Sequence, residues 1–428
     1  MDGAHTFTSY ETGRRYRITV LSGTVAEVSG SQALGAGDRG LTVAAGADGS
    51  WEVAVEELDS ARRPYRTSAA FGEVMEAARR SFAEFADAVA PWRSADTPAA
   101  ELAAYVVWSA TVRPAGLVTR PAGSPELAWD QFHLPFDHQD ESGALPDSVT
   151  HSEVLYNFVK PPIHGWTFGH LRRRLPEPLT PAQLNEAYDR LTRWTDFWLA
   201  ARRAPGAELP HYQHGNDSGW DNATTFDPAR VAVTADLAAF LTLQLRELAR
   251  LATELDLPDE ARHWTRTADA TQAAMLDELW TGERFVARGV DSTATWDSSS
   301  LLDLMPMALG EHLPENIGKT LAARIETHLT PYGLATEQPA SPHYLADGYW
   351  RGPIWAPATV LIEDGLRRAG HQRLADDISA RFRALCEAHG FAENFDALTG
   401  TGLRDRAYTW TASSYLLLAE AHAHRDSR

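Results

Sequence analysis

Two loop segments place carboxylates beside aromatic rings, and this combination suits acid–base chemistry. In "DSGWDN", Asp221 directly follows Trp220. In "FAENFDALTG", Glu393 is flanked by Phe391 and Phe395 just beyond the end of a predicted helix. Cleavage of a glycosidic bond needs one carboxylic acid to protonate the leaving oxygen and a second carboxylate as base or nucleophile, and an apolar wall raises the pKa of the acid. We therefore predict Asp221 as the acid and Glu393 as the base.

Each segment also holds a second carboxylate with a simpler interpretation. Asp217 can equally be a structural turn residue of its loop. Asp396 stands ahead of Leu-Thr-Gly, a sequence typical of a turn, so we predict that Asp396 forms that turn.

Aromatic residues gather in loops of similar composition. Three loops carry them: "ELAWDQFHLPFDH" with Trp129 and Asp130, "DGYWRGPIWAP" with Trp350, Arg351 and Trp355, and "AYTWTAS" with Trp410. A tryptophan face packs on the C–H groups of a sugar, while Asp and Arg side chains bind its hydroxyl groups. For any single ring, a role as a core anchor is equally plausible. The repeated pairing of Trp with polar residues favours a sugar-binding surface for the set.

Signatures of other chemistries are weak or missing. The sequence contains no P-loop, no CxxC, no HExxH and no GxSxG. The nearest approach to a metal-binding pair is His211 and His214 in "HYQHG". We therefore predict no cofactor and no metal site.

Composition and charge limit the class of partner. The 428 residues include 58 acidic and 39 basic side chains, which give a formal net charge of −19. This balance argues against nucleic-acid and anionic-membrane surfaces and favours neutral or cationic ligands. No signal peptide is visible, no run approaches the ~18–20 apolar residues of a membrane span, and Cys386 is the one cysteine. The sequence predicts a soluble, cytoplasmic protein and does not specify its oligomeric state.

Hydrophobic patterning divides the chain into a short β-rich segment over residues 1–68 and a helical domain over residues 69–428. "RRYRITVLSGTVAEVSG" and "SWEVAVEELD" alternate like antiparallel strands. Thr180 as N-cap and Pro181 at the first helical position predict the start of a helix. Roughly a dozen helices are expected near 71–89, 98–112, 130–138, 152–158, 164–174, 181–199, 229–254, 258–280, 298–308, 313–328, 354–369, 371–389 and 407–424.

The ordered set of motifs resembles a known family. "WD" (129–130), "KPPIHGW" (160–166), "NDSGWDN" (216–222), "GYWRGPIW" (348–355) and "ENFDALTG" (393–400) resemble the α-glucosidase-type enzymes of glycoside hydrolase family 63, which includes mannosylglycerate and glucosylglycerate hydrolases. The sequence is more distantly similar to the family 37 trehalases. The match covers roughly three quarters of the chain, and "YWRGPIW" and "DSGWDN" are its most specific signals.

This resemblance implies a mainly α fold, an (α/α)6 barrel with a small β-rich N-terminal segment. It implies hydrolysis of a small α-linked oligosaccharide or glucoside with inversion at the anomeric carbon, Asp221 as general acid and Glu393 as general base. An inverting pair of carboxyl groups is expected about 6.5–9.5 Å apart.

The resemblance also assigns substrate contacts. The family's sugar-binding tryptophans fall on Trp129, Trp350 and Trp355, with Asp130 and Arg351 as hydroxyl partners. Gly219 lets the backbone approach the sugar, and Trp220 forms part of the wall. Lys160, where many relatives have Gln, and Trp410 are expected close to the pocket.

Two other functions fit parts of the pattern. N-acylglucosamine epimerases also use (α/α)6 barrels, but they need a pair of positioned histidines as proton-transfer bases. Here His133, His164, His214 and His343 stand outside any such motif. A catalytically inactive sugar-binding protein is the third possibility, and the presence of both candidate carboxylates argues against it.

Overall fold

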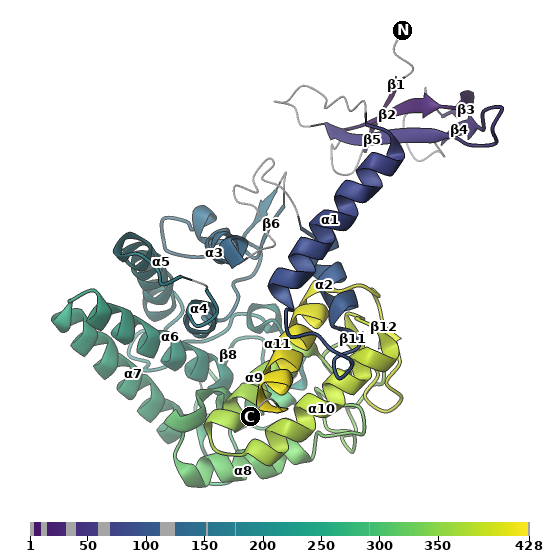
Figure 1. The fold of residues 1–428 in the computed structure, drawn as a ribbon. Helices are drawn as coiled ribbons and strands as arrows, with labels where there is room; N and C mark the ends of the chain where they lie inside the picture. Colours follow the sequence, from purple (N-terminus) through teal and green to yellow (C-terminus); the bar gives the residue numbers. More distant parts are fainter. Residues whose placement is uncertain are drawn as a thin grey trace. The chain divides into compact units, whose positions relative to one another are not determined.

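The computed structural model describes residues 4–9, 15–30, 40–58, 69–111, 125–150, 153–175, 177–290 and 292–426. They divide into two units, one formed mainly by the chain up to Ala83 and the other mainly by the chain from Glu84 onward (Figure 1). This division falls inside helix α1 (Phe71–Val89). The boundary expected after residue 68 remains a prediction.

The N-terminal unit contains antiparallel strands, as the alternating pattern predicted. A three-stranded sheet has the order β1-β2-β5, and β3 pairs with β4. The strands are β1 (Ala4–Thr8), β2 (Arg15–Ser22), β3 (Thr24–Ser29), β4 (Gly40–Ala44) and β5 (Glu52–Leu58). Gly23 turns the chain from β2 into β3 with a φ of 89°, and a β-carbon there would lie 2.6 Å from the carbonyl oxygen of Ala44. Only glycine fits this turn without a backbone shift.

The second unit is rich in helices. Its α-helices after α1 are α2 (Ala100–Ser109), α3 (Pro125–His133), α4 (His164–Arg172), α5 (Pro181–Ala200), α6 (Ala235–Glu254), α7 (Pro258–Leu279), α8 (Glu315–Glu326), α9 (Ala356–Arg368), α10 (Gln372–His389) and α11 (Thr409–Asp426). The 3₁₀ segments are η1 (Phe136–His138), η2 (Gly215–Ser218), η3 (Thr224–Phe226) and η4 (Leu301–His312). Short strands lie between them: β6 (Ser148–Val149), β7 (Val154–Leu155), β8 (Ala232–Val233), β9 (Ala287–Gly289), β10 (Thr295–Trp296), β11 (Asn394–Phe395) and β12 (Gly402–Leu403).

Local sequence explains where several helices begin. At α5, the Thr180 hydroxyl accepts a hydrogen bond from the backbone N–H of Gln183, and the Gln183 side chain accepts one from the Thr180 backbone N–H. This capping box satisfies two N–H groups that have no partner inside the helix, and Pro181 follows at the first position. The apolar face of α5 is buried at Ala187, Leu191 and Trp198.

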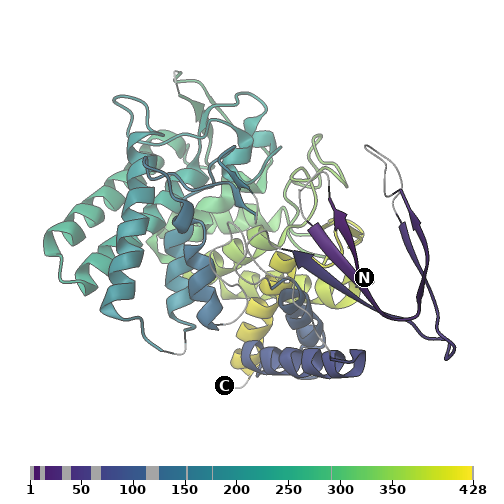
Figure 2. The same ribbon diagram turned by 90° about the horizontal axis from the view of Figure 1, so that it is seen from above.

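The helices pack in a consistent order around this unit. α6 packs against α4, α5, α7 and η4; η4 packs against α8 and α9; α9 packs against α10 and α11; and α11 packs against α2. The helices α6 and α7 lie side by side in both views (Figures 1 and 2). The segments α4, α6, η4, α9 and α11 therefore each contact the next, while α5, α7, α8 and α10 lie against them as partners.

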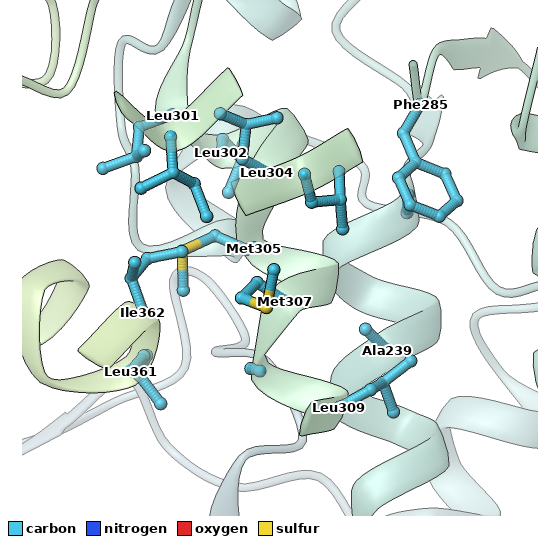
Figure 3. Close-up of a cluster of buried hydrophobic side chains, with 14 of the residues drawn as sticks. Ala239, Phe285, Leu301, Leu302, Leu304, Met305, Met307, Leu309, Leu361 and Ile362 are labelled. Atoms are coloured by element: carbon cyan, nitrogen blue, oxygen red, sulfur yellow. The ribbon is translucent and has the colours of Figure 1, made fainter. Parts of the chain in front are cut away.

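The segment η4 lies at the centre of the largest apolar cluster. Figure 3 shows its side chains with those of neighbouring helices: Leu301, Leu302, Leu304, Met305, Met307 and Leu309 of η4, Ala239 of α6, and Leu361 and Ile362 of α9. The sequence predicted a helix here, and Pro306 together with Gly310 accounts for its irregular form. A proline lacks the N–H of a regular helix, and Gly310 has a left-handed φ of 59°.

One predicted helix is wrong. The described part of residues 152–158 contains strand β7, which pairs with β6 as a short antiparallel hairpin. The backbone N–H of Asp147 donates to the carbonyl of Leu155 at 2.7 Å. Val154 favours an extended backbone because its β-carbon is branched, and the Pro161-Pro162 pair that follows prevents a helix from continuing.

Among the residues that the structure describes, no helix has both the length and the apolar character needed to cross a bilayer.

Candidate active site

Asp221 lies in a loop of residues 214–227, the Asp221 loop, between two short 3₁₀ turns, η2 and η3. Gly219 ends the first turn with a left-handed φ of 77°, a conformation that side chains with a β-carbon rarely adopt. Gly215 allows a close approach, since a β-carbon there would lie 2.6 Å from the carbonyl oxygen of Asp221. Gly215 and Gly219 therefore allow the tight backbone path that places Asp221 between the two turns.

Asp217 is a buried anchor of the same loop. Its Oδ2 accepts hydrogen bonds from Arg202 Nη1 and from the backbone N–H of Gln213, both at 2.9 Å. Its Oδ1 accepts one from the backbone N–H of Val159 at 3.3 Å. With both oxygens used by the protein, Asp217 has the structural role that the sequence left open.

The far end of the Asp221 loop is fastened to buried carboxylates. The hydroxyl of Thr224 donates to Glu337 at 2.7 Å, and that of Thr225 donates to Asp303 at 2.9 Å. Trp296 Nε1 adds a hydrogen bond to the Thr225 carbonyl at 2.8 Å. Burial raises the pKa of Asp303 to about 6. These bonds hold the chain directly after Asp221 onto the interior.

Asn222 and Arg351 fasten the Asp221 loop to residues 348–355, the Trp350 loop. Asn222 Nδ2 donates to the carbonyl of Gly348, and Asn222 Oδ1 accepts from the backbone N–H of Trp350, both at 3.0 Å. Arg351 Nε donates to the Asn222 carbonyl at 2.7 Å, and its guanidinium forms an ion pair with Asp227. The position of Asp221 is therefore set by a loop more than 120 residues further along the chain.

Four tryptophans form a continuous stack beside these loops. The rings of Trp350 and Trp355 are parallel, with centroids 4.1 Å apart and an interplanar angle of 5°. Trp220 packs on Trp350 at 4.6 Å, and Trp410 meets Trp355 edge-on at 5.3 Å. Trp355 is fully buried, and Trp220 and Trp350 are 6% and 4% exposed. The stack is a rigid apolar wall joining the two loops to the start of α11.

Glu393 is tied to the same wall from the other side. Ile354 and Phe395 exchange backbone hydrogen bonds of 2.7 and 3.1 Å, which join the Trp350 loop to β11. The N–H of Glu393 donates to the carbonyl of Asp405 at 2.8 Å, and Trp410 Nε1 donates to the Glu393 carbonyl at 3.4 Å. The Trp350 loop thus connects the segments that carry the two predicted catalytic carboxylates.

Asp396 forms a turn, as predicted. Its Oδ1 accepts a hydrogen bond from the backbone N–H of Leu398 at 2.8 Å, and its own N–H donates to the Thr401 carbonyl at 2.9 Å. The carboxylate is used within the turn that leads from β11 to β12.

The surroundings of Asp221 favour its protonated form. Burial is the largest effect and raises the pKa of Asp221; Asp147 raises it further, while Lys160 and a hydrogen bond from Tyr349 lower it. Lys160 Nζ forms an ion pair with Asp147 and donates to the carbonyl of Asn216, each at 3.0 Å. Part of the effect of the Lys160 charge is therefore offset by its partner.

The charges of Glu393 and Asp221 both affect the pKa of the Tyr349 phenol. Burial raises the pKa of Glu393, Arg404 opposes this change and Asp405 adds to it. Burial raises the pKa of Tyr349 to about 12, and the negative charges of both Asp221 and Glu393 contribute to this rise. Tyr349 thus lies within electrostatic reach of both carboxylates, and their action in one site stays a prediction.

The sequence of this chain matches a known protein family. The family model of the mannosylglycerate hydrolase MGH1-like glycoside hydrolase domain matches residues 104–411. The chain belongs to this family. It is a glycoside hydrolase of family 63 type, as its motifs indicated.

Relatives of this glycoside hydrolase extend over most of the chain. A mannosylglycerate hydrolase of Rubrobacter radiotolerans is 26% identical over 70% of this chain and 82% of its own length. Mannosylglycerate hydrolase MGH1 of Selaginella moellendorffii is 24% identical over 68% of this chain and 75% of its own. The crystal structure of a family 63 mannosylglycerate hydrolase of Thermus thermophilus in complex with glucose has a TM-score of 0.64 at 20% identity, covering 74% of this chain and 99% of that one. At 20% identity, the similarity to the Thermus thermophilus structure shows a shared fold alone.

Most of the predicted site residues of this glycoside hydrolase lie together. Lys160 lies against the Asp221 loop, where it donates to the carbonyl of Asn216. Gly219 and Trp220 lie on the Asp221 loop, and Trp350, Trp355 and Trp410 form the stack next to it. Their contact with a sugar stays a prediction; the full burial of Trp355 gives its ring a supporting position behind Trp350.

Trp129 and Asp130 lie on α3, and Trp129 packs against a different apolar cluster. The Trp129 ring packs on His133 at 4.2 Å and on Phe168 at 6.4 Å. Phe226, at the end of the Asp221 loop, packs against both this cluster and the one that contains Trp220 and Trp350. The role of Trp129 and Asp130 in binding stays a prediction.

The sequence did not single out Tyr349, Arg404 or Asn222. Asn222 was visible within "DSGWDN", but its partners lie in a distant loop. Tyr349 stands within "DGYWRGPIWAP", where the tryptophans and Arg351 drew the prediction. Arg404 lies ten residues after Asn394, with which it forms a hydrogen bond of 2.9 Å, and no local pattern marks it.

Proposed function

We propose that this glycoside hydrolase is an inverting, exo-acting α-glycosidase in which Asp221 is the general acid and Glu393 the general base. The observation that supports this most directly is the Trp350 loop, which bonds to Asn222 directly after Asp221 and to Phe395 two residues after Glu393. Tyr349 on this loop lies within electrostatic reach of both carboxylates. Two carboxylates on separate loops, brought to one ring beside a tryptophan wall, match the two-carboxylate chemistry of glycoside hydrolysis.

In this mechanism the Asp221 carboxyl gives its proton to the glycosidic oxygen as the bond to the anomeric carbon breaks. A water molecule attacks that carbon from the opposite face, and Glu393 accepts the proton of the water. Burial favours the protonated Asp221 that this step requires. Arg404 favours the ionised Glu393 that the base requires.

The substrate class we propose is an α-mannoside or α-glucoside of a small polar aglycone that carries a carboxylate. Relatives named mannosylglycerate hydrolases support this class. Lys160 and Arg404 also put two positive charges near the catalytic carboxylates. The net charge of the whole chain favoured neutral or cationic ligands, but local charges decide what enters a site.

We also propose that the second unit closes into an (α/α)6 barrel. α4, α6, η4, α9 and α11 would form the inner ring, and α5, α7, α8 and α10 would belong to the outer ring. Support comes from the order of helix packing and from the site loops, since the Asp221 loop precedes α6, the Trp350 loop precedes α9 and Glu393 precedes α11. This arrangement gathers the helix N-termini of the inner ring at the site. The cytoplasmic location remains a prediction.

The epimerase alternative receives no support from the histidines. Burial lowers the pKa of His164 to about 4, and the ring lies among core aromatics. His214 caps η2, accepting a hydrogen bond from the N–H of Asn216 at Nδ1.

A substrate screen tests the proposal. The purified protein is incubated with α-mannosyl and α-glucosyl glycerates and with α-linked disaccharides, and the released sugar is identified. Asp221→Asn and Glu393→Gln should each lower turnover by at least ~10³-fold without changing the thermal unfolding midpoint by more than a few degrees. Turnover by either variant at the wild-type rate would refute the assignment.

A further inference from the structure

Two residues with unusual backbone conformations meet between the catalytic loops. In the described part of the chain, three non-glycine residues have a left-handed φ, and two of them are Tyr349 (63°) and Arg404 (60°). The guanidinium carbon of Arg404 lies 4.9 Å from the centre of the Tyr349 ring. Side chains with a β-carbon strain the backbone in this region, and such strain persists where the surroundings impose it, commonly at functional sites.

The surroundings of Tyr349 impose its conformation. Its carbonyl accepts a hydrogen bond from Trp355 Nε1 at 2.8 Å, and the neighbouring Gly348 carbonyl accepts one from Asn222 Nδ2 at 3.0 Å. Trp355 also meets the Tyr349 ring edge-on at 5.0 Å. The backbone and the ring of Tyr349 are therefore both held in place, on the loop that Asn222 ties to the residue after Asp221.

The Arg404 guanidinium is also fixed by two polar contacts. Its Nη1 donates to Asn394 Oδ1 at 2.9 Å, and its Nη2 pairs with Asp347 Oδ1 at 2.8 Å. Asn394 directly follows Glu393, and Asp347 lies two residues before Tyr349. Arg404 therefore spans the segment of the base and the loop of the phenol.

The charged and titratable groups around each carboxylate are different. Those acting on Asp221 are Lys160, Asp147 and Tyr349. Those acting on Glu393 are Arg404 and Asp405, and Glu393 in turn acts on Tyr349 and Tyr408. Tyr349 thus acts electrostatically on both carboxylates, and Arg404, bonded to Asn394 directly after Glu393, is the cation that acts on the base.

We propose that Tyr349 and Arg404 are a pair of positioning residues, with the Tyr349 phenol holding Asp221 and the Arg404 guanidinium holding Glu393 in their working states. This inference rests on the proposed roles of the two carboxylates. When Asp221 gives its proton to the leaving oxygen, it becomes a carboxylate, and the hydrogen bond from Tyr349 strengthens because its acceptor is now charged. Arg404 keeps Glu393 ionised until it takes the proton of the attacking water. Stacking of Arg404 on the Tyr349 ring links the two positions.

The test is the pH profile of kcat/KM for Tyr349→Phe and Arg404→Gln, measured with an α-glycoside that the wild type hydrolyses. The acid limb of the profile reports the base, and the alkaline limb reports the acid. Tyr349→Phe removes a group that lowers the pKa of Asp221, so the alkaline limb should move to higher pH by about 0.5–1 unit while the acid limb stays. Arg404→Gln should move the acid limb to higher pH by a similar amount, and Arg404→Lys should move it less.

Matched controls exist on the same loops. Tyr344→Phe removes a phenol near Asp396, and Arg406→Gln removes a guanidinium whose hydrogen bond goes to the Gly402 carbonyl; both should leave the limbs in place. An aryl α-glycoside with a good leaving group provides a second readout, because it needs little acid assistance. The loss of kcat in Tyr349→Phe should shrink with this substrate, whereas the loss in Arg404→Gln should remain.

The outcomes separate the two proposals. If Asp221→Asn and Glu393→Gln keep turnover, the proposed function fails and the roles of the pair fail with it. If those variants are inactive but Tyr349→Phe and Arg404→Gln lose activity without moving a limb, or move the same limb, only the inference about the pair is overturned.

Discussion

Asn222 and Trp350 are joined across 128 residues by a hydrogen bond of 3.0 Å from the Trp350 backbone N–H to Asn222 Oδ1. The other end of the Asn222 amide donates to the Gly348 carbonyl at 3.0 Å. One side chain directly after Asp221 thereby fixes the loop that carries the tryptophan wall. The proposed acid and the wall against which it is buried form a single structural unit.

Asn222→Ala should weaken this unit. We expect the variant to lose about 1–2 kcal/mol of unfolding free energy, because two partly buried backbone groups lose their partner. We expect kcat to fall roughly tenfold or more, because Asp221 is no longer held in place. Denaturant unfolding and steady-state kinetics measure the two effects. Asn185→Ala, which removes an exposed amide bonded to the Pro181 carbonyl on α5, should change neither.

Two buried acids behind the Asp221 loop should contribute less to stability as pH rises toward neutrality. Burial raises the pKa of Asp236 to about 7 and that of Asp303 to about 6, although Tyr212 donates a hydrogen bond to Asp236 at 3.0 Å. Between pH ~4 and pH ~7 the folded state keeps protons that the unfolded state has lost. The contribution of these groups to folding is therefore complete below pH ~4 and is lost as pH rises through their folded pKa values.

Asp236→Asn provides the measurement. Asn resembles the neutral acid and does not titrate, so the difference in unfolding free energy between variant and wild type should shift in favour of the variant from pH 5 to pH 7.5. Asp277→Asn, an exposed change on α7, should show a constant difference. A constant difference for Asp236→Asn as well would contradict the assigned direction.

Short-range sequence signals were enough to predict parts of this fold. The rest depends on contacts between residues that are far apart in the sequence, and these could not be predicted. The start of α5 follows from Thr180, Pro181 and Gln183, which lie within one turn. The expected helix over 152–158 failed because a short apolar run fits either structure, and the pairing of β6 with β7 decided it. The sequence identified Asp221 and Glu393 as candidate catalytic residues because each has aromatic neighbours along the chain.

The side chains that hold the site together were harder to identify. The Arg351 guanidinium bonds with the Asn222 carbonyl and with Asp227, a role that the sequence did not indicate, and its contact with a sugar hydroxyl stays a prediction. The left-handed backbone of Tyr349 has no sequence signature, because a tyrosine gives no sign of this conformation. Such roles depend on which loops meet, and this is settled by the helices beneath them.

Gly219 should have a functional role beyond its conformation. Gly219 and Gly206 have φ values of 77° and 78°, and a β-carbon at either would meet no atom within 4 Å. Gly219→Ala and Gly206→Ala should therefore each cost roughly 1–2 kcal/mol of stability from backbone strain alone. Only Gly219→Ala should reduce kcat/KM, because its added methyl group meets the sugar. Equal kinetic effects in both variants would remove Gly219 from the binding site.

Asp130 tests the predicted contribution of α3 to sugar binding. If its carboxylate binds sugar hydroxyls, Asp130→Ala should reduce kcat/KM by the equivalent of about 2–4 kcal/mol, because those hydroxyls are left buried without a partner. Gln131→Ala, an exposed neighbour on the same helix, should behave as wild type. Wild-type kinetics for Asp130→Ala would exclude this residue from the site.

The stereochemistry of the first product tests the central claim most directly. An inverting pair needs room for a water molecule between Glu393 and the anomeric carbon, whereas a retaining pair attacks that carbon itself. Proton NMR within minutes of mixing enzyme with an α-linked substrate distinguishes the anomers before mutarotation mixes them. Our account predicts initial release of the β-anomer, and initial release of the α-anomer would contradict it.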